Sequence, residues 1–172
     1  MMETEKNLFN SKAIEEIRNL LLEKHETISM AESVTSGLMQ AAFSIAPDAS
    51  KFYQGGITAY NIGQKCRHLF VEPIHAESCD CVSEKVADEM AINVCKLFIS
   101  DWGIGITGYA IPVPESEQKI FAHYSIACKN KIVLQKKIIA KKEEALRVQL
   151  FFVNAVLEDL AILLREKQMA HT

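Results

Sequence analysis

The sequence predicts an α/β fold, a three-layer α/β/α sandwich with a mixed central sheet. Short apolar segments alternate with amphipathic segments along the chain, a pattern typical of helices that cover both faces of a sheet. Two further apolar segments, 119–128 and 131–140, meet around Asn130 and predict an antiparallel hairpin. The 172 residues, 49% of them hydrophobic, suffice for a sizeable core, so we expect residues 1–172 to form a single domain.

The first part of the chain predicts a helix, a strand and a second helix. Apolar residues at helical spacing indicate an amphipathic helix over 8–23. The short apolar run at 27–30 indicates a buried strand, and the helix after it covers 38–43. This second helix should end near Ala46, because a Pro-Asp turn signal follows.

The next segments predict a strand and a short helix. Residues 52–60 indicate a strand that Gly55 and Gly56 interrupt, and paired glycines there suggest a bulge or a close backbone approach. A short helix is expected over 61–70, with the asparagine at its start as the cap. Residues 71–80 are expected to be irregular, because the proline within them excludes a long helix.

The remaining segments predict a helix, a strand, a loop, the hairpin and a last helix. The clearest helix covers 83–100 with Ser83 as its cap. The strand at 102–108 has large residues on one face and glycines on the other, so another element can pack close to it. Prolines and charges make 111–118 a surface loop, and 143–165 is a long apolar helix wide enough to suggest contact with another subunit. In the helix at 83–100, the expected core stripe is Val86, Met90, Val94 and Leu97. In the last helix, it is Leu146, Leu150, Phe151, Val153, Val156, Leu157, Leu160 and Leu164.

Composition and charge exclude several classes of protein. The net charge of −3 gives no electrostatic reason to expect nucleic acid or a membrane surface as a partner. We find no run of about 18 apolar residues and no signal-peptide pattern, so neither a membrane span nor export is expected. The 5 cysteines have neither a disulfide-framework spacing nor a zinc-site spacing. Free thiols in a reducing cytoplasm, without a metal site, are therefore expected.

The segment 31–37, between the first predicted strand and the second helix, holds three hydroxyls and one carboxylate. The N–H groups at the start of a helix favour an anion or an oxyanion, and α/β folds place ligands at such turns. The alternative is a serine-rich helix cap, because Ser and Thr are preferred there. The sequence has no G-x-S-x-G elbow, P-loop or G-x-G-x-x-G fingerprint. The residues of interest in the turn are Glu32, Ser33, Thr35, Ser36 and Gly37.

Other polar residues follow later strand ends and could converge on this turn. Tyr60 ends the second predicted strand and Lys65 lies on the helix after it, while Thr107 and Gly108 end the third strand. Arg147 lies near the start of the last helix. A serine nucleophile needs a base within reach, which can be a lysine with a lowered pKa. The structural alternatives are a solvated lysine, a tyrosine at the core rim and an arginine paired with a glutamate on its own helix.

Four segments together resemble the C-terminal domain of the CinA family of competence/damage-inducible proteins, the nicotinamide-nucleotide amidases. The likeness covers nearly the whole chain, and the order and spacing of the segments make it specific. The segments are Ala-Glu-Ser-x-Thr-x-Gly at 31–37, Phe-Tyr-Gln-Gly-Gly-Ile-Thr-Ala-Tyr at 52–60 with Lys65 after it, Val-Ser-Glu-Lys-Val-Ala at 82–87 with Met90 and Ala91, and Gly-Ile-Thr-Gly-Tyr at 105–109.

The resemblance implies hydrolysis of the carboxamide of nicotinamide mononucleotide. The products would be nicotinic acid mononucleotide and ammonia, formed without a metal or an organic cofactor. The partner would be this small nucleotide, and the chain would assemble as a dimer or larger homo-oligomer. Because 172 residues leave no room for the large N-terminal domain of some members, the resemblance is to the stand-alone form.

Carried onto this chain, the resemblance implies that Ser33 is the nucleophile and that Lys65 or Tyr60 manages the proton. The hydroxyls of Thr35 and Ser36 and the N–H groups around Gly37 would hold the substrate or its oxyanion. An arginine on the last helix would meet the ribose phosphate. The complete set of implied binding residues is Glu32, Thr35, Ser36, Gly37, Thr107, Gly108 and Arg147.

The chain departs from the family pattern at several positions. Val34 and Ser36 replace a cysteine and a glycine, and a serine is costly at 36 if that position needs a positive φ. The segment 109–115 has no glycine, where the family usually has several. Glu143 stands in place of an arginine, which would disfavour a phosphate unless the lysines before it substitute. The alternative function is therefore a catalytically impaired paralogue that acts as a nucleotide-binding or oligomeric interaction module.

Overall fold

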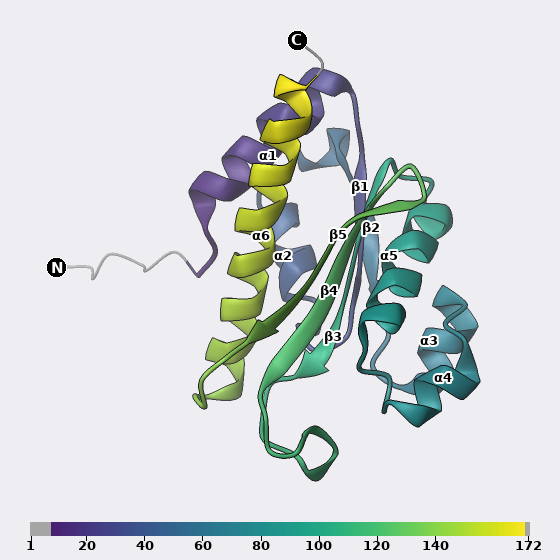
Figure 1. The fold of residues 1–172 in the computed structure, drawn as a ribbon. Coiled ribbons are helices and arrows are strands. Elements are labelled where there is room, and N and C mark those ends of the chain that lie inside the picture. The colour runs from purple at the N-terminus through teal and green to yellow at the C-terminus, as the bar shows by residue number, and fades with distance from the viewer. Residues whose placement is uncertain (1–7, 171–172) are drawn as a thin grey trace, which may run out of the picture.

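The computed structural model describes residues 8–170, and the five-stranded sheet that they form lies between two layers of helices (Figure 1). The order across the sheet is β2-β1-β3-β4-β5. β2, β1 and β3 run parallel, whereas β4 is antiparallel to β3 and β5 is antiparallel to β4, so the predicted mixed sheet is confirmed. The strands are β1 (Ile28–Glu32), β2 (Tyr53–Thr58), β3 (Trp102–Tyr109), β4 (Phe121–Cys128) and β5 (Lys131–Ile139).

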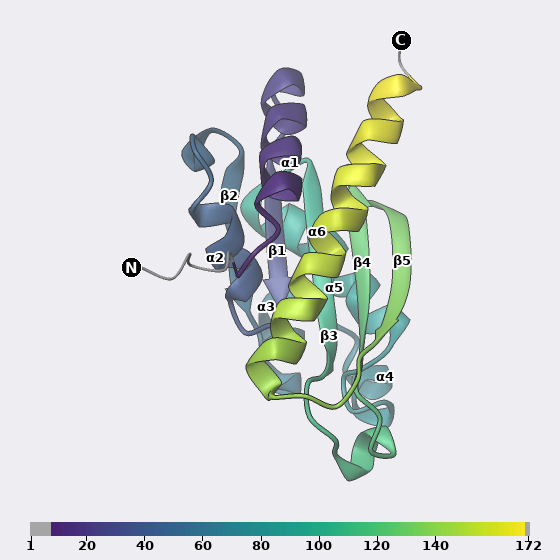
Figure 2. The same cartoon turned by 90° about the vertical axis from the view of Figure 1, so that its left-hand side faces the viewer.

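The helices form two layers, one on each face of the sheet. Figures 1 and 2 show α1, α2 and α6 on one face and α3, α4 and α5 on the other, which confirms the predicted sandwich. Within the described residues, no helix has the length and apolar character that crossing a bilayer requires. The bounds are α1 (Ser11–Lys24), α2 (Leu38–Ser44), α3 (Ile62–Leu69), α4 (Pro73–Ser78), α5 (Glu84–Phe98) and α6 (Ala145–Met169).

The sheet has a switch point at β1. The chain passes from β1 to β2 on one side of the sheet, and later to β3 on the other side of β1. In open parallel sheets, ligands bind outside the carboxyl ends of the strands where the strand order reverses in this way. The hydroxyl-rich turn follows β1 and therefore lies at the switch point.

Two glycine predictions are confirmed by the backbone. Gly55 has a φ of 128°, and the register between β1 and β2 shifts beside it, as expected of a bulge. A Cβ on Gly103 would lie 2.3 Å from the Ala91 carbonyl oxygen, and one on Gly105 would lie 2.4 Å from that of Ala87. The glycine face of β3 therefore lets the backbone of α5 pack directly on the strand.

Some local expectations are wrong. Residues 71–80 contain a helix, because Pro73 begins α4 at the position where a missing N–H costs no helical hydrogen bond. β1 extends through Glu32, two residues further than expected. At the start of α6, the buried face contains Val148 and Phe152, which lie one helical turn apart. Some residues of the expected core stripe therefore lie on the exposed side of the helix. The expected core residues that are exposed instead are Leu97, Leu146 and Phe151.

Candidate active site

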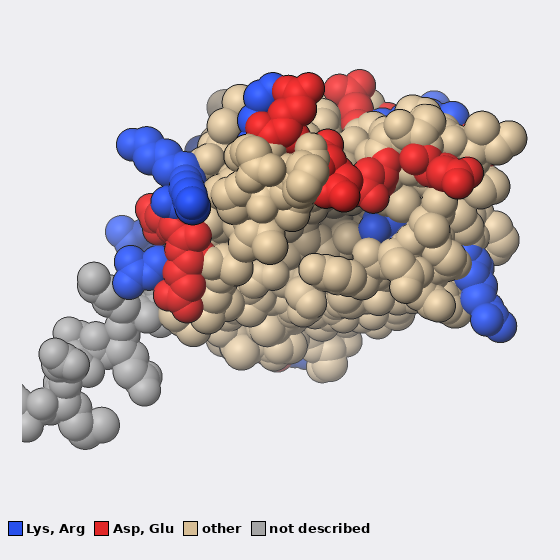
Figure 3. Space-filling model, turned by 90° about the horizontal axis from the view of Figure 1, so that it is seen from below, with Lys and Arg blue, Asp and Glu red and all other residues tan. Residues whose placement is uncertain are grey.

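A cavity of about 640 Å³ opens at the carboxyl ends of β1 and β3, at the switch point of the sheet. It is lined by the turn after β1, the start of α3, α4 and the segment that follows it, the end of β3 and the loop after it, and the start of α6. Figure 3 views this end of the molecule and shows acidic side chains gathered along one edge of the face. The fold thus brings segments from most of the chain to one hollow.

Ser33 and Lys65 meet inside this cavity. The Lys65 Nζ donates a hydrogen bond to the Ser33 Oγ at 2.9 Å and lies 3.5 Å from the Tyr60 carbonyl oxygen. Both side chains are buried, with 6% of Ser33 and 2% of Lys65 exposed. Burial lowers the pKa of Lys65 below its ordinary value of 10.5, while the nearby Cys81 and Asp80 act in the opposite direction. The site therefore holds a hydroxyl beside an amine that loses its proton more easily than a solvated lysine.

Local sequence explains why these two side chains meet. Ser33 directly follows β1, and its N–H donates to the Ile106 carbonyl at 3.1 Å, which ties the turn to β3. Asn61 caps α3 by accepting from the Gln64 N–H at 3.1 Å. Because Lys65 lies one turn beyond this cap, its N–H donates to the Asn61 carbonyl and its side chain points back toward the end of β1.

Glu32 holds the start of α2 in place. Its fully buried carboxylate accepts from the Thr35 hydroxyl at 2.5 Å, and from the N–H groups of Gly37 and Met39 at 3.1 Å and of Gln40 at 2.7 Å. The chain itself thus supplies the anion that this helix N-terminus favours. Glu32, Thr35 and Gly37 are brought together but do not line the cavity, and a role for them in substrate binding stays a prediction.

Ser36 occupies a left-handed position in the same turn, with a φ of 49°. Position 36 thus requires a positive φ, and a serine in this conformation costs roughly 1–2 kcal/mol relative to a glycine. Its side chain is exposed and does not line the cavity, while its N–H closes the turn on the Ser33 carbonyl at 3.1 Å. The structure gives Ser36 a place in the shape of the turn and no contact with the cavity.

Thr107 and Gly108 line the cavity from the end of β3, as expected of a second polar strand end. The Thr107 hydroxyl donates to the Cys81 carbonyl at 2.7 Å, so it fixes the segment between α4 and α5. A Cβ on Gly108 would lie 2.3 Å from the Phe121 carbonyl oxygen, so only glycine fits against β4 at this point.

Tyr60 and Arg147 lie in different surroundings. Tyr60 lines the cavity, but 71% of the residue is exposed, and its contact with the Lys65 amine is made by its carbonyl. Arg147 is exposed and lies in a separate depression beside Lys141 and Phe151. The structure therefore does not bring Arg147 to the residues with which the resemblance grouped it.

Sequence reasoning missed Asp80 and Tyr109, which also line the cavity. The Tyr109 hydroxyl donates to the Asp80 carboxylate at 2.8 Å, and burial together with this carboxylate raises the pKa of Tyr109. Asp80 and Cys81 have φ values of 50° and 59°, a pair of left-handed residues that no motif announces. Burial raises the pKa of the Cys81 thiol, so it stays protonated beside Lys65.

Gln149 is a second missed residue. It lies on α6, lines the cavity, and donates from its Nε2 to the Val34 carbonyl at 2.8 Å. In the sequence it is one polar residue within a long apolar helix, and only the packing of α6 brings it to the turn after β1. As for metal ions, the part of the chain that the structure describes holds no group of three or more His, Cys, Asp or Glu placed to bind one.

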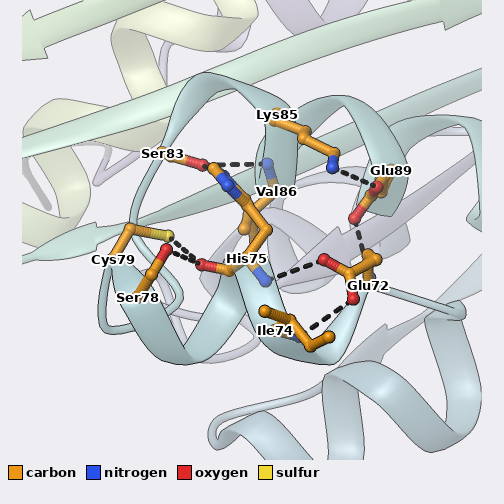
Figure 4. A network of polar contacts seen from close by, with 9 residues as sticks. All are labelled: Glu72, Ile74, His75, Ser78, Cys79, Ser83, Lys85, Val86 and Glu89. Carbon is orange, nitrogen blue, oxygen red and sulfur yellow. Dashed lines mark hydrogen bonds and ion pairs between the residues drawn. The ribbon is translucent and has the colours of Figure 1, made fainter.

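A polar network fixes α4 against the start of α5, on either side of the turn that carries Asp80 (Figure 4). The His75 Nε2 lies 2.9 Å from the Ser83 Oγ, which also caps α5. The Glu72 carboxylate caps α4 by accepting from the His75 N–H at 2.7 Å, and the Glu72 N–H donates to Glu89 at 3.0 Å. The Ser83–His75 contact thus serves the packing of two helices, and it holds the Asp80 turn at both ends.

Fold and site together define a class, an α/β/α protein with a buried serine–lysine pair at the switch point of its sheet. The sequence model of the CinA C-terminal domain family matches residues 10–164. The chain belongs to this family.

Comparisons with known proteins agree with this membership. A CinA-like protein of Synechocystis sp. is 41% identical over 100 residues, which cover 58% of this chain and 24% of the relative. A CinA-like protein of Prochlorococcus marinus is 31% identical over 147 residues, 84% of this chain and 35% of the relative. The chain thus spans about a quarter to a third of the length of these curated relatives.

Solved structures share the fold. The crystal structure of a competence or damage-inducible protein from Enterobacter asburiae superposes with a TM-score of 0.85 at 22% identity, covering 91% of this chain and 98% of that one. The structure of the competence/damage inducible protein CihA from Agrobacterium tumefaciens gives 0.81 at 23% identity, over 95% and 99% of the two chains. At these identities the likeness concerns the fold alone.

Proposed function

We propose that this chain is an amidohydrolase in which Ser33 attacks a carboxamide and Lys65 moves the proton. The observation that carries the proposal is the 2.9 Å hydrogen bond between Lys65 Nζ and Ser33 Oγ inside the cavity. The lowered pKa of Lys65, which its burial causes, favours the neutral amine that a serine nucleophile needs as its base.

The reaction has two steps. Neutral Lys65 accepts the hydroxyl proton of Ser33 as Oγ bonds to the carboxamide carbon, and it gives the proton to the leaving nitrogen when the C–N bond breaks. Ammonia leaves, and an acyl ester remains on Ser33. Water then attacks the ester carbon while Lys65 accepts a water proton, and this proton returns to Ser33 Oγ as the carboxylic acid is released.

The oxyanion formed in each step needs N–H donors near Ser33. The N–H groups of residues 36–40 already have acceptors, including Glu32 for the Gly37 N–H that the resemblance would assign to this task. In the described part of the turn, the N–H groups of Val34 and Thr35 donate to no protein acceptor. Val34 lines the cavity and Thr35 does not, so we assign the oxyanion to the Val34 N–H.

Gln149 supports this assignment by holding the backbone of Val34. Its side chain donates to the Val34 carbonyl at 2.8 Å. Because this carbonyl belongs to the same residue as the assigned N–H, the bond restrains the backbone that carries the donor. Gln149 is in this proposal a positioning residue for the oxyanion donor.

The first substrate to test is nicotinamide mononucleotide, which the family resemblance implies, with nicotinic acid mononucleotide and ammonia as products. Purified protein is expected to release ammonia from it, and Ser33→Ala and Lys65→Met are expected to lose about a thousandfold or more in kcat. Ser44→Ala is the matched control, because Ser44 is exposed on α2 and its hydroxyl binds only the Ala41 carbonyl. Equal rates from Ser33→Ala and the parent protein would remove Ser33 from the mechanism.

The second candidate function is a catalytically impaired paralogue that binds a nucleotide or serves as an oligomeric interaction module. It is favoured by Arg147, which lies outside the cavity, and by the serine in the left-handed position at 36. This candidate predicts no turnover on a panel of nucleotide amides, together with a ligand-induced rise in Tm. Turnover of ordinary efficiency on any of them would eliminate it.

A further inference from the structure

The side of α6 that points away from the sheet carries apolar side chains among charged ones. Figure 2 views this side and shows α6 lying along the molecule beside α1. About 11 residues make three turns of an α-helix, so Arg147 and Glu158 lie on the same side of α6. Phe151 and Ile162 follow them by one turn each and are 48% and 45% exposed. We call these four residues the outer stripe of α6. A helix side that only meets solvent carries polar side chains, so the outer stripe is suited to a contact.

The two charges of the outer stripe have no ionic partner among the residues that the structure describes. Both side chains are exposed, and the ion pairs of this part of the chain involve neither Arg147 nor Glu158. Glu158 accepts one hydrogen bond, from the neutral side chain of Asn10 at 3.0 Å. Arg147 and Glu158 are therefore free to pair with charges on another molecule.

Arg147 lies in the depression beside β5, which has a volume of about 310 Å³. The charged residues that line this depression are Lys141, Glu143 and Arg147, so cations outnumber anions there. Phe151 and Ile139 add apolar surface to the same lining. The depression is thus suited to a carboxylate that stands beside apolar side chains. The other end of the outer stripe presents such a carboxylate, that of Glu158 next to Ile162.

We infer that the outer stripe of α6 binds the same stripe on a second copy of this chain, with the two helices antiparallel about a twofold axis. A twofold contact is self-complementary, so every pairing in it occurs twice. Arg147 of each copy faces Glu158 of the other, and Phe151 of each copy faces Asn154 of the other. A parallel arrangement would place like charges opposite each other, which disfavours it.

The centre of this contact is apolar. The Asn154 Nδ2 donates to the Leu8 carbonyl at 3.1 Å, and Leu8 is 63% exposed. Phe151 therefore meets Leu8 of the other copy where it faces Asn154. The two Arg147–Glu158 pairs flank these apolar contacts, in the usual order of an apolar core and a polar rim. The apolar burial supplies affinity, while the ion pairs determine register and orientation. The inference does not depend on the proposed amidohydrolase function.

The experiment measures the Kd of the dimer by sedimentation equilibrium, over a range of protein concentrations at fixed ionic strength. Arg147→Glu and Glu158→Arg are each expected to raise Kd by about tenfold or more, because each places like charges opposite each other twice. The double variant restores both pairs and should return Kd to within about threefold of the parent value. Arg67→Glu and Glu166→Arg are the matched controls and should leave Kd unchanged. Arg67 is exposed on α3, across the sheet, and Glu166 is exposed at the far end of α6.

An equimolar mixture of Arg147→Glu and Glu158→Arg gives a second measurement. One variant carries two acidic side chains at these positions and the other two basic ones, so a mixed dimer should form with about the parent Kd. A parent protein that is monomeric at every concentration would overturn the inference and leave the outer stripe to a different partner. A dimer whose Kd the single variants leave unchanged, or a double variant as weak as the single ones, would overturn it as well. Because dimerisation stabilises the folded chain, the unfolding of α6 variants is compared at protein concentrations well below Kd.

Discussion

Lys65 is the residue whose chemistry depends most on its surroundings. The sequence placed it on the helix after the second predicted strand, and the family resemblance implied its role as a base. Its burial could not be read from the sequence, since the cavity in which it lies is lined by residues of α4, β3 and α6 as well as of its own helix. The tertiary structure therefore determines whether this lysine is a solvated cation or a base.

We predict that kcat/KM rises with pH along a limb that titrates below 10.5, because the neutral amine of Lys65 is the reactive form and burial lowers its pKa. Asp80→Asn should move the midpoint of this limb to lower pH, since the Asp80 charge raises the pKa of Lys65. A pH–rate profile measures both, with Glu166→Gln as the control. A midpoint that stays in place or moves up in Asp80→Asn would contradict this assignment.

The lowered pKa of Lys65 also determines how the free energy of unfolding changes with pH. Because the folded pKa of Lys65 lies below the unfolded value, the unfolded chain binds more protons in the interval between them. The contribution of Lys65 to the free energy of unfolding therefore increases with pH through this interval, up to about the ordinary value of 10.5. In Lys65→Met this contribution is absent.

At the scale of the elements, Glu32 joins β1 to α2. The sequence showed a carboxylate before a hydroxyl-rich turn and left open whether that turn is an anion cradle or a cap. The structure gives a cap of an uncommon kind, in which a strand carboxylate accepts four hydrogen bonds from the turn and the helix. Propensity rules consider the residue directly before a helix, so they could not find an acceptor on the preceding strand.

Glu32→Gln is expected to lower the free energy of unfolding by about 2–4 kcal/mol, because a neutral amide with one acceptor atom replaces two charged oxygens that hold four donors. Urea unfolding followed by circular dichroism measures the loss. Glu15→Gln, on the exposed face of α1, is the control and should change little. A stable Glu32→Gln protein that has lost only substrate affinity would instead support the substrate-binding role that the resemblance implies.

For the whole molecule, the packing of α6 shows how far sequence periodicity reaches. The apolar run correctly predicted a long helix, and most of the expected stripe is buried. In its first turns this helix is apolar on several sides, so the sequence does not show which side faces the core. It therefore could not distinguish the buried Phe152 from the exposed Phe151. Contact with the sheet and α1 decides the phase.

Two adjacent phenylalanines of α6 allow a test of which side of the helix faces the core. Phe152 is fully buried and Phe151 is 48% exposed. Phe152→Ala should lower the free energy of unfolding by about 3–5 kcal/mol, whereas Phe151→Ala should cost less than about 1 kcal/mol. Denaturant midpoints of the two variants provide the measurement, and similar losses in both would contradict the observed packing of α6.

The fold as a whole followed from local patterns, and the site followed only in part. Alternating segments, caps and the hairpin turn are local, which explains why the sandwich and the element order, apart from α4, were predictable. Ser33 was predictable because it directly follows a strand, and Lys65 because it lies on the short helix after the next strand. Asp80, Tyr109 and Gln149 reach the cavity through tertiary packing and left-handed backbone, for which the sequence carries no periodic signal. The homo-oligomer that the resemblance implies stays a prediction.

The carboxylate that closes the turn also bears on the order in which the chain folds. Its N–H donors lie only 5, 7 and 8 residues away in sequence, so the ring closes at a small entropic cost. A seven-residue helix is far below the length at which an isolated helix is stable, so α2 depends on contacts outside itself, and this carboxylate supplies the ones nearest in sequence. The serine turn can thus acquire its shape as an early, local event. The arrival of α6 from the other end of the chain can complete it later.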